Sequence, residues 1–352
     1  MKDFLKVIET WRESRKPVAI ATNVKLEGAS LRPLGAKMIM TSTMDISGSV
    51  TGGCIEGVVY QEAQEVLKDA KPKLLHYGLV DADNPAEVGL SCGSSLDVFV
   101  ESLDSPAWLE IYPALKTLIE QNQPAVVATV ISGSELGKKM MLGYDGYILG
   151  TMGIAGLNTQ VQEWMKKQLT ANQTSWKSFS IENKEIEVFV DVFSPSSRLI
   201  IIGAVHVAIP LVTLAKALGY YTIVIDPRKT FATKDRFSHA DELIVDWPST
   251  ALENLQLDEN TYIAVISHDE KLDNPALAVA LTSSARYIGV LGTRKNLPRR
   301  LAALQELGVS QEQFERLRAP IGIHLGAVEP EEIALSILAE IVSAKRGLPK
   351  TQ

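Results

Sequence analysis

The apolar residues of the C-terminal half alternate between short continuous runs and stretches with helical spacing. The run RLIIIGA (198–204) is almost entirely apolar, as is typical of a strand buried on both faces of a parallel sheet. The next stretch, HVAIPLVTLAKALG (206–219), places apolar residues three and four positions apart and ends at a glycine, which predicts a helix. Further buried runs follow in YYTIVID (220–226), DELIVD (241–246), TYIAVIS (261–267) and YIGVLG (287–292). We therefore predict a Rossmann-like, doubly wound α/β domain over residues 197–352.

The first 196 residues contain a diverged duplication. Four segments of the first copy recur in the same order in the second: PVAIATNV as PAVVATVI, LGAKMIM as LGKKMML, GSV as GTM, and SLDVFVESLDSP as EIEVFVDVFSP. The spacing of each copy predicts the order strand, loop, strand, glycine turn, helix, strand. We therefore predict an α+β domain made of copy one (residues 1–106) and copy two (residues 107–196), placed before the Rossmann-like domain.

Three segments of copy one contain cysteine or charged residues that the corresponding segments of copy two lack at those positions. Copy one reads EGASLRPLG, with Arg32, where copy two reads SGSELG. It reads TGGCIEG, with Cys54 and Glu56, where copy two reads GIAGLNT, and VGLSCGSS, with Cys92, where copy two reads SFSIENK. Because copy two has the same pattern without these residues, folding alone does not explain them, and all four are candidate functional residues.

Cys54 follows two glycines and precedes a stretch with helical spacing, which predicts a thiol near a helix N-terminus. There the helix dipole and the free N–H groups favour a thiolate, and Gly52 and Gly53 let the backbone approach a ligand closely. Cys92 lies on a second glycine-containing loop. Two such thiols suit a soft metal or sulfur transfer, so both cysteines are candidate catalytic residues and metal ligands. The alternatives are a small buried hydrophobic residue for Cys54, and a helix-stabilising instead of a catalytic role for Glu56.

The turn after the first strand of the Rossmann-like domain departs from the dinucleotide-binding pattern G-x-G-x-x-G/A. It reads GAVHVA (203–208), and Asp226 occupies the acidic position 23 residues after Gly203. Val205 replaces the glycine that lets the backbone approach a pyrophosphate, so we expect NAD(P) not to bind, whereas a single phosphate at the helix N-terminus is compatible with this turn. The candidate binding residues here are Gly203, Ala204, His206 and Asp226.

Polar residues follow the other buried runs, at the strand ends where ligands bind in this architecture. Arg228 and Arg294 are candidate anion ligands, because a guanidinium group forms paired hydrogen bonds with phosphate. Gly292, in the same segment as Arg294, is a further candidate contact. His268, beside Asp269, is either an acid–base or ligand residue or part of ordinary loop capping.

The composition and net charge argue against several classes of protein. The chain has 352 residues and a net charge of −7, which argues against a general nucleic-acid-binding protein. The N-terminal residues have no apolar segment of signal-peptide length, and polar and helix-breaking residues interrupt the most apolar stretch, so we expect neither export nor membrane insertion. Two cysteines in such a sequence indicate a reducing cytoplasm. The strand-rich copies offer sheet edges that a homodimer would cover.

These segments together resemble the xanthine dehydrogenase accessory factor family, XdhC/CoxI. The resemblance rests on EGASLRPLGAKM, GSVTGGCIEG, GLSCGSSLDVFVE, GAVHVA, VIDPR, GVLGTRKNLPRR and APIGIHLGAVEPEEIALSILAEI, and spans residues 17–346. The chain departs from the family pattern at three places. Both later glycines of the usual GAGHVG turn are replaced, CGS stands where CGG is frequent, and His324 stands where an acidic residue is usual.

The resemblance implies a maturation factor instead of a conventional enzyme. Family members bind and protect the molybdenum cofactor (molybdopterin), assist its sulfuration together with a cysteine desulfurase, and deliver it to a xanthine dehydrogenase-type molybdenum hydroxylase. On this interpretation Cys54 or Cys92 is a molybdenum ligand or a sulfur relay. One alternative is an NAD(P)-dependent oxidoreductase with thiol-assisted chemistry, which Val205 disfavours. Another is an adaptor that binds no small molecule, which leaves the asymmetric placement of the cysteines unexplained.

Overall fold

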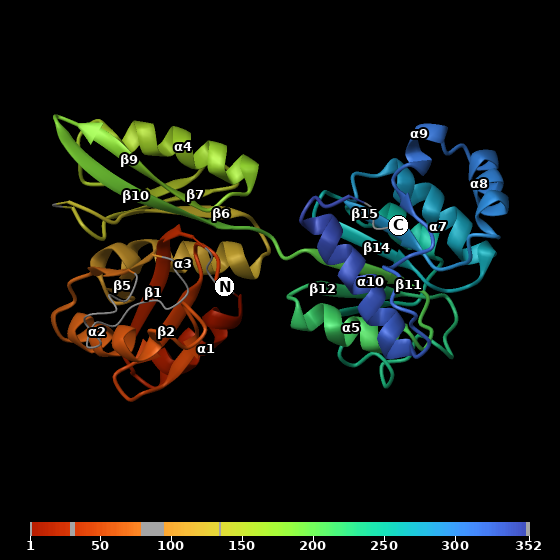
Figure 1. Ribbon diagram of the computed structural model, residues 1–352, viewed down its shortest axis with the longest axis horizontal. Coiled ribbons are helices and arrows are strands. Elements are labelled where there is room, and N and C mark those ends of the chain that lie inside the picture. The colour runs from red at the N-terminus through yellow and green to blue at the C-terminus, as the bar shows by residue number, and fades with distance from the viewer. Residues whose placement is uncertain (1, 29–31, 79–94, 134, 350–352) are drawn as a thin grey trace. The chain divides into compact units, whose positions relative to one another are not determined.

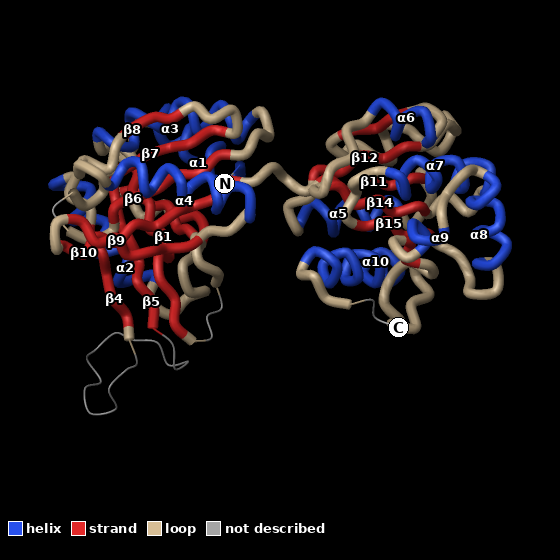
Figure 2. The backbone as a smooth tube through the Cα atoms, turned by 90° about the horizontal axis from the view of Figure 1, so that it is seen from above, coloured by secondary structure: helices blue, strands red, loops and turns tan. Residues whose placement is uncertain are grey.

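The computed structural model describes residues 2–28, 32–78, 95–133 and 135–349. The chain forms two compact units, Met1–Pro195 and Ser196–Gln352 (Figure 1). Each unit combines strands with covering helices (Figure 2). Among the helices of the described residues, none has the length and apolar character needed to cross a membrane.

The first unit contains one topology twice: a helix, three strands, a second helix and two strands. Copy one consists of α1 (Lys2–Glu13), β1 (Val18–Glu27), β2 (Lys37–Thr41), β3 (Ile46–Gly48), α2 (Glu56–Asp69), β4 (Lys73–Tyr77) and β5 (Ser95–Ser102). Copy two consists of α3 (Pro106–Glu120), β6 (Ala125–Val130), β7 (Lys139–Gly143), β8 (Ile148–Gly150), α4 (Leu157–Ala171), β9 (Ser175–Ile181) and β10 (Lys184–Phe193). Each copy forms an antiparallel sheet, in the orders β3-β2-β1-β5-β4 and β8-β7-β6-β10-β9. The sequence repeat is therefore a structural repeat, and each copy begins with a helix that the predicted pattern omitted.

Each sheet of the first unit has one face covered by a helix of its own copy and one face turned to the other copy. In copy one, Ala19 and Val98 pack with Val59 of α2. Side chains of a strand alternate between its two faces. The intervening positions, such as Ile20 in copy one and Val127 in copy two, therefore share a second core with α1 and α3. This shared core joins the two copies into one unit.

Among the ion pairs that join the copies in the described residues, two occupy matching positions of the repeat. Lys37 pairs with Asp191, and Lys139 Nζ lies 2.8 Å from Glu101 Oε1. Lys37 and Lys139 hold the same position in the two copies, and so do Glu101 and Asp191. Each copy thus supplies the lysine of one pair and the carboxylate of the other, as expected for two copies related by a pseudo-two-fold axis.

The second unit is a parallel sheet between two helical layers. Its strands are β11 (Arg198–Ile202), β12 (Tyr221–Ile225), β13 (Glu242–Ile244), β14 (Thr261–Val265), β15 (Tyr287–Val290) and β16 (Leu317–Arg318). Its helices are α5 (Ala208–Ala217), α6 (Pro248–Asn254), α7 (Glu270–Thr282), α8 (Leu297–Glu306), α9 (Gln311–Phe314) and α10 (Pro330–Lys345). The strand order β13-β12-β11-β14-β15-β16 is that of a Rossmann fold. The predicted fold class, an α+β repeat domain followed by a Rossmann-like domain, is confirmed.

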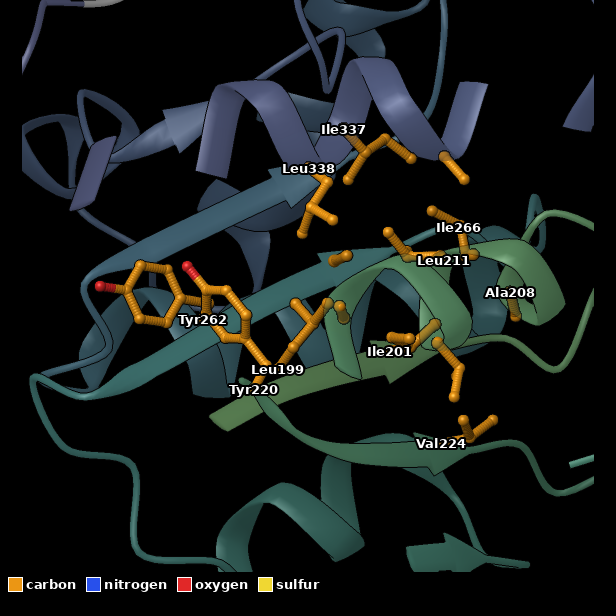
Figure 3. Close-up of a cluster of buried hydrophobic side chains, with 14 of the residues drawn as sticks. Leu199, Ile201, Ala208, Leu211, Tyr220, Val224, Tyr262, Ile266, Ile337 and Leu338 are labelled. Atoms are coloured by element: carbon orange, nitrogen blue, oxygen red, sulfur yellow. The ribbon is translucent and has the colours of Figure 1, made fainter. Parts of the chain in front are cut away.

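Both faces of this parallel sheet are buried. Leu211 of α5 and Ile337 of α10 pack in one cluster with Ile201 of β11 (Figure 3). On the opposite face, Ile200 packs in a cluster with Leu277 of α7. Since neighbouring residues of a strand point to opposite faces, burial on both sides requires the continuous apolar runs seen in the sequence.

Candidate functional site

At one edge of the copy-one sheet lie the strand ends that flank, in the sequence, the segments distinguishing copy one from copy two. Strands β1, β3 and β4 end there and β2 and β5 begin there, because all neighbouring strands of this sheet are antiparallel. We call it the copy-one edge. Arg32, which is exposed, lies between β1 and β2, and Cys54 lies between β3 and α2. Cys92 belongs to the connection from β4 to β5 and lies outside the described residues.

One carboxylate holds the turn before α2. Glu56 accepts 2.9 Å hydrogen bonds from the backbone N–H groups of Thr51, Gly52 and Gly53. It also accepts hydrogen bonds from the hydroxyl groups of Ser49 and Thr51, at 2.5 Å and 2.7 Å. Burial alone would raise the pKa of Glu56, but the hydrogen bonds from Ser49, Thr51 and Gly52 outweigh burial and hold this pKa well below its usual value. Both oxygens of Glu56 are engaged by the turn, which favours a positioning role over catalysis.

Copy two holds the corresponding turn with an amide. Asn158 stands at the position of Glu56, and its Oδ1 atom accepts hydrogen bonds from Met152 N–H at 3.0 Å and from Thr151 Oγ1 at 3.3 Å. Glu56 forms the corresponding bonds with Val50 N–H and Ser49 Oγ. Holding this turn is therefore common to both copies, and the sequence comparison overstated how far Glu56 is specific to copy one.

At this turn, copy one has the thiol of Cys54, which copy two lacks. Cys54 is exposed, which contradicts the alternative of a small buried hydrophobic residue at this position. Its N–H donates to Thr51 Oγ1 over 3.1 Å, and it lies two residues before the start of α2. Gly53 has a φ of +129°, and no heavy atom lies within 4 Å of an added Cβ. Because Gly52 and Gly53 are also exposed, a ligand has open access to the backbone beside the thiol.

In the second unit, the strand order reverses between β11 and β14, where ligands of Rossmann folds bind. Gly203 follows β11 with a φ of +106°, and an added Cβ would lie 2.6 Å from Ser267 Cα. The close approach of the two loops therefore requires glycine here whether or not a ligand binds. Ala204 donates its N–H to Asp226 Oδ2 over 2.7 Å, and His206 is exposed.

The carboxylate of Asp226 is fully buried and is bound within the unit. Arg228 donates to it from its backbone N–H at 2.9 Å, from Nε at 2.8 Å and from Nη2 at 2.6 Å. Burial would raise the pKa of Asp226, but the hydrogen bonds from Arg228 and Ala204 outweigh it and lower this pKa. The Arg228 guanidinium also lies 4.4 Å from the ring centroid of Phe231. Asp226 and Arg228, each predicted to contact a ligand, thus bind each other.

A cavity of about 100 Å³ lies at the carboxyl ends of β14 and β15. His268, Gly292 and Arg300 are among the residues that line it. Arg294 follows in the same loop as Gly292 and is exposed. The structure therefore brings the predicted residues His268 and Gly292 together. Asp269 accepts a 3.0 Å hydrogen bond from Lys271 N–H as the N-cap of α7, so capping explains this neighbour of His268.

A polar cluster next to this cavity was not predicted. Ser267 Oγ donates to Asp273 Oδ1 over 2.6 Å, and Arg300 Nη2 lies 3.3 Å from Asp273 Oδ2. Burial raises the pKa of Asp273 in spite of both contacts. The segments SHDEKLD (267–273) and GTRKNLPRR (292–300), both at strand ends, contain these three residues, but neither segment indicated that Asp273 pairs with Ser267 and Arg300.

Within the described part of the chain, no group of three or more His, Cys, Asp and Glu side chains could hold a metal ion. The prediction that Cys54 and Cys92 are metal ligands includes a residue outside that part, and it stays a prediction.

Known proteins resemble both units. The family described as "XdhC and CoxI family" matches residues 11–78, and "XdhC Rossmann domain" matches residues 199–341. A crystal structure described as a xanthine dehydrogenase from Bacillus halodurans is 28% identical, has a TM-score of 0.79 and covers 98% of this chain and 96% of its own.

Two curated relatives extend over most of the chain. One, from Bacillus subtilis (strain 168), is named as a probable xanthine dehydrogenase subunit and is 24% identical over 349 residues, 98% of each chain. The "Molybdenum cofactor insertion chaperone PaoD" of Escherichia coli (strain K12) is 27% identical over 332 residues, 94% of this chain and 85% of PaoD. These matches confirm the resemblance seen in the sequence motifs. The chain belongs to the XdhC and CoxI family.

Proposed function

We propose that this chain is an accessory protein that binds the molybdenum cofactor and assists its insertion into a xanthine dehydrogenase-type molybdenum hydroxylase. The names of two relatives support this role, since one is a molybdenum cofactor insertion chaperone and the other a probable xanthine dehydrogenase subunit. The observation that carries the proposal is the exposed thiol of Cys54. It lies on a glycine turn that Glu56 holds, and the corresponding turn of copy two has no thiol.

The copy-one edge has chemistry suited to the metal end of this cofactor. Molybdenum in the cofactor carries sulfur ligands, so a thiolate is a chemically matched neighbour. Gly52 and Gly53 leave the backbone beside Cys54 open to a ligand, and Arg32 is exposed at the same edge. In this proposal Cys54, together with Cys92, contacts the metal or passes on sulfur that a cysteine desulfurase supplies.

The Rossmann-like unit has its own candidate contacts for an anionic group. His206 and Arg294 are exposed there, and His268 and Gly292 line one cavity. An NAD(P)-dependent oxidoreductase is the weaker candidate. Asp226, which would accept the ribose hydroxyl groups, already accepts hydrogen bonds from Arg228 and Ala204, and Val205 occupies a glycine position of the fingerprint.

Anaerobic titration of the full chain with molybdenum cofactor tests the proposal, with NADH as the competing ligand. We expect the wild type to bind the cofactor and Cys54→Ala or Cys92→Ala to lose most of the affinity. Ser238→Ala, at an exposed position of the second unit, is the matched control and should bind as the wild type does. Full affinity in both cysteine variants would make the thiols dispensable for binding. NADH binding without cofactor binding would overturn the proposed function.

A further inference from the structure

The cavity at the carboxyl ends of β14 and β15 is too small for a whole ligand. Its walls come from the start of α7, from the loop between β15 and α8 with the first turn of α8, and from the residues after β16. Its volume of about 100 Å³ is well below the roughly 300–1,000 Å³ of pockets that enclose small-molecule ligands. The cavity therefore has room for one polar group of a ligand, and the rest of such a ligand lies outside it.

Arg300 brings a mostly buried guanidinium group to this cavity. Its side chain is 11% exposed. Its Nη1 atom donates to Asn274 Oδ1 over 3.0 Å, and its Nη2 atom lies 3.3 Å from Asp273 Oδ2. These contacts fix the plane of the guanidinium group, and the group has more N–H donors than these contacts use. An oriented guanidinium group with remaining donors suits an anion rich in oxygen atoms.

The carboxylates around Arg300 are balanced by arginine side chains. Asp273 pairs with Arg300 itself, and its other oxygen accepts a 2.6 Å hydrogen bond from Ser267 Oγ. Glu270 is the only carboxylate among the described residues that line the cavity, and it pairs with Arg299 at 2.6 Å. Each carboxylate thus has an arginine partner, and the remaining polar groups of the lining decide which ligand the cavity favours.

The N-terminus of α8 is one of these groups. Its N-cap residue, Asn296, and its first residue, Leu297, both line the cavity. In this fully described helix, the side chain of Asn296 accepts no capping hydrogen bond, and the first turn has no acidic residue. Helix α7 differs, because Asp269 caps it and two acidic residues lie in its first turn. The N–H groups and the dipole at the start of a helix favour an anion, so the start of α8 suits an anion better than that of α7 does.

The usual phosphate position of a Rossmann unit, the turn after β11, has its polar groups bound within the unit. The N–H of Ala204 donates to Asp226 over 2.7 Å, and Arg228 Nη2 donates to the same oxygen over 2.6 Å. Arg236 Nη1 donates to the carbonyl oxygens of Ala204 and Phe231, at 2.9 Å and 2.7 Å. An anion there would have to displace these contacts, whereas the cavity at β14 and β15 already exists.

We propose that this cavity binds the phosphate group of the ligand, with Arg300, His268 and the N–H groups at the start of α8 as its contacts. His268 lines the cavity from the loop after β14, and its exposed ring supplies a further donor. The inference rests on the proposed function and deepens it, because the molybdenum cofactor carries a phosphate group as well as its metal. It assigns that phosphate to the Rossmann-like unit.

Titration of the full chain with inorganic phosphate, followed by phosphorus-31 nuclear magnetic resonance, tests the site without the cofactor. We expect saturable binding that Arg300→Lys and His268→Gly each weaken about tenfold, as for the loss of a charge-assisted hydrogen bond. Lysine keeps a cation beside Asp273, and glycine accepts the φ of 62° at position 268, so both variants preserve the local fold. If circular dichroism shows that Arg300→Lys does not fold, His268→Gly decides.

Lys295→Gln is the matched control for this titration. Lys295 is exposed in the same loop and lies outside the lining of the cavity, so its loss removes a positive charge without removing a contact. This variant should bind phosphate as the wild type does. The proposal is overturned if the wild type shows no saturable binding, or if Lys295→Gln weakens binding as much as the cavity variants do.

Cofactor binding separates this inference from the proposed function. We expect Arg300→Lys and His268→Gly to weaken binding of the molybdenum cofactor about tenfold, and an excess of inorganic phosphate to compete with the cofactor in the wild type. If the wild type does not bind the cofactor, the proposed function fails while the phosphate titration still tests the cavity. If the wild type binds it, both variants bind it equally well and phosphate does not compete, only this inference fails.

Discussion

The backbone N–H of Gly53 donates a 2.9 Å hydrogen bond to Glu56 Oε2 and so ties the residue before Cys54 to the first residue of α2. Other N–H groups of the turn share the same carboxylate, so the position of the thiol depends on a side chain two residues further along the chain. Asn158 holds the matching turn of copy two through hydrogen bonds with Thr151 and Met152. The second turn therefore serves as an internal control for the first.

Replacing Glu56 by alanine should loosen the turn that presents Cys54. We expect faster hydrogen exchange at the amides of Gly52 and Gly53 and a loss of about 1–3 kcal/mol in the free energy of unfolding, because several turn donors lose their acceptor. Asn158→Ala should lose about 1 kcal/mol and leave exchange around Cys54 unchanged. Hydrogen-exchange mass spectrometry and urea unfolding measure both effects. Equal protection of the Cys54 turn in the wild type and Glu56→Ala would refute the anchoring role.

The ionised state of Glu56 makes part of the stability depend on pH. The pKa of Glu56 is lower in the folded chain than in the unfolded chain, where it is about 4.3. Its contribution is therefore fully present above that value and is lost as the pH falls toward the folded-state pKa. We expect Glu56→Gln to show a shallower loss of stability than the wild type between about pH 5 and pH 2. Parallel acid-dependence curves for the two proteins would contradict this assignment.

Removing one partner of the buried Lys139–Glu101 ion pair should lower the free energy of unfolding. Lys139 and Glu101 have side chains that are 1% and 6% exposed. Lys139→Met leaves Glu101 buried without its cation, and we expect a loss of about 3–5 kcal/mol. Combining it with Glu101→Gln should restore part of this stability, because no charge is then buried. Urea unfolding followed by tryptophan fluorescence compares the variants, and Trp108, whose ring centroid lies 4.7 Å from Lys139 Nζ, contributes to this signal. Equal stabilities of the single and double variants would show that the pair does not act as a unit.

Position 203 of the Rossmann-like unit, next to the point where the strand order reverses, should tolerate no side chain. Gly203→Ala combines a φ of +106° with a Cβ only 2.6 Å from Ser267 Cα, so we expect a loss of about 3 kcal/mol or more. Gly219→Ala is the matched control, since its φ is +78° and its Cβ would meet no atom within 4 Å. That variant should lose about 1–2 kcal/mol from backbone strain alone. Thermal unfolding distinguishes the two, and similar losses would mean that the contact with Ser267 relaxes easily.

The long periodic elements could be predicted from the sequence, whereas short or weakly patterned ones could not. The inner strands β11, β12, β14 and β15 give apolar runs because both faces of a parallel sheet are buried. The edge strand β3 has three residues, none of them buried, so it leaves no clear apolar pattern. The helices α1 and α3 begin the two copies, but their sequences have diverged too far to be recognised as parts of one repeat.

In the candidate site, too, some features could be predicted from the sequence and others could not. The comparison of the copies singled out Cys54, and the structure shows its thiol exposed. It did not identify Glu56 and Asn158 as counterparts, because a carboxylate and an amide differ in the sequence although both accept one corresponding N–H bond, from Val50 and from Met152.

The sequence by itself determined the two kinds of domain, the internal repeat and the asymmetry between its copies, because periodicity and residue identity are local properties. The tertiary structure alone decided which polar groups bind each other and which face solvent. The sequence predicted that Asp226 and Arg228 contact a ligand. In the structure, the loop after β12 places them so that they bind each other. The sequence was equally consistent with a buried Cys54. In the structure, Glu56 holds the turn and Cys54 is exposed. Strand register and loop conformation set such contacts, and both depend on the whole fold.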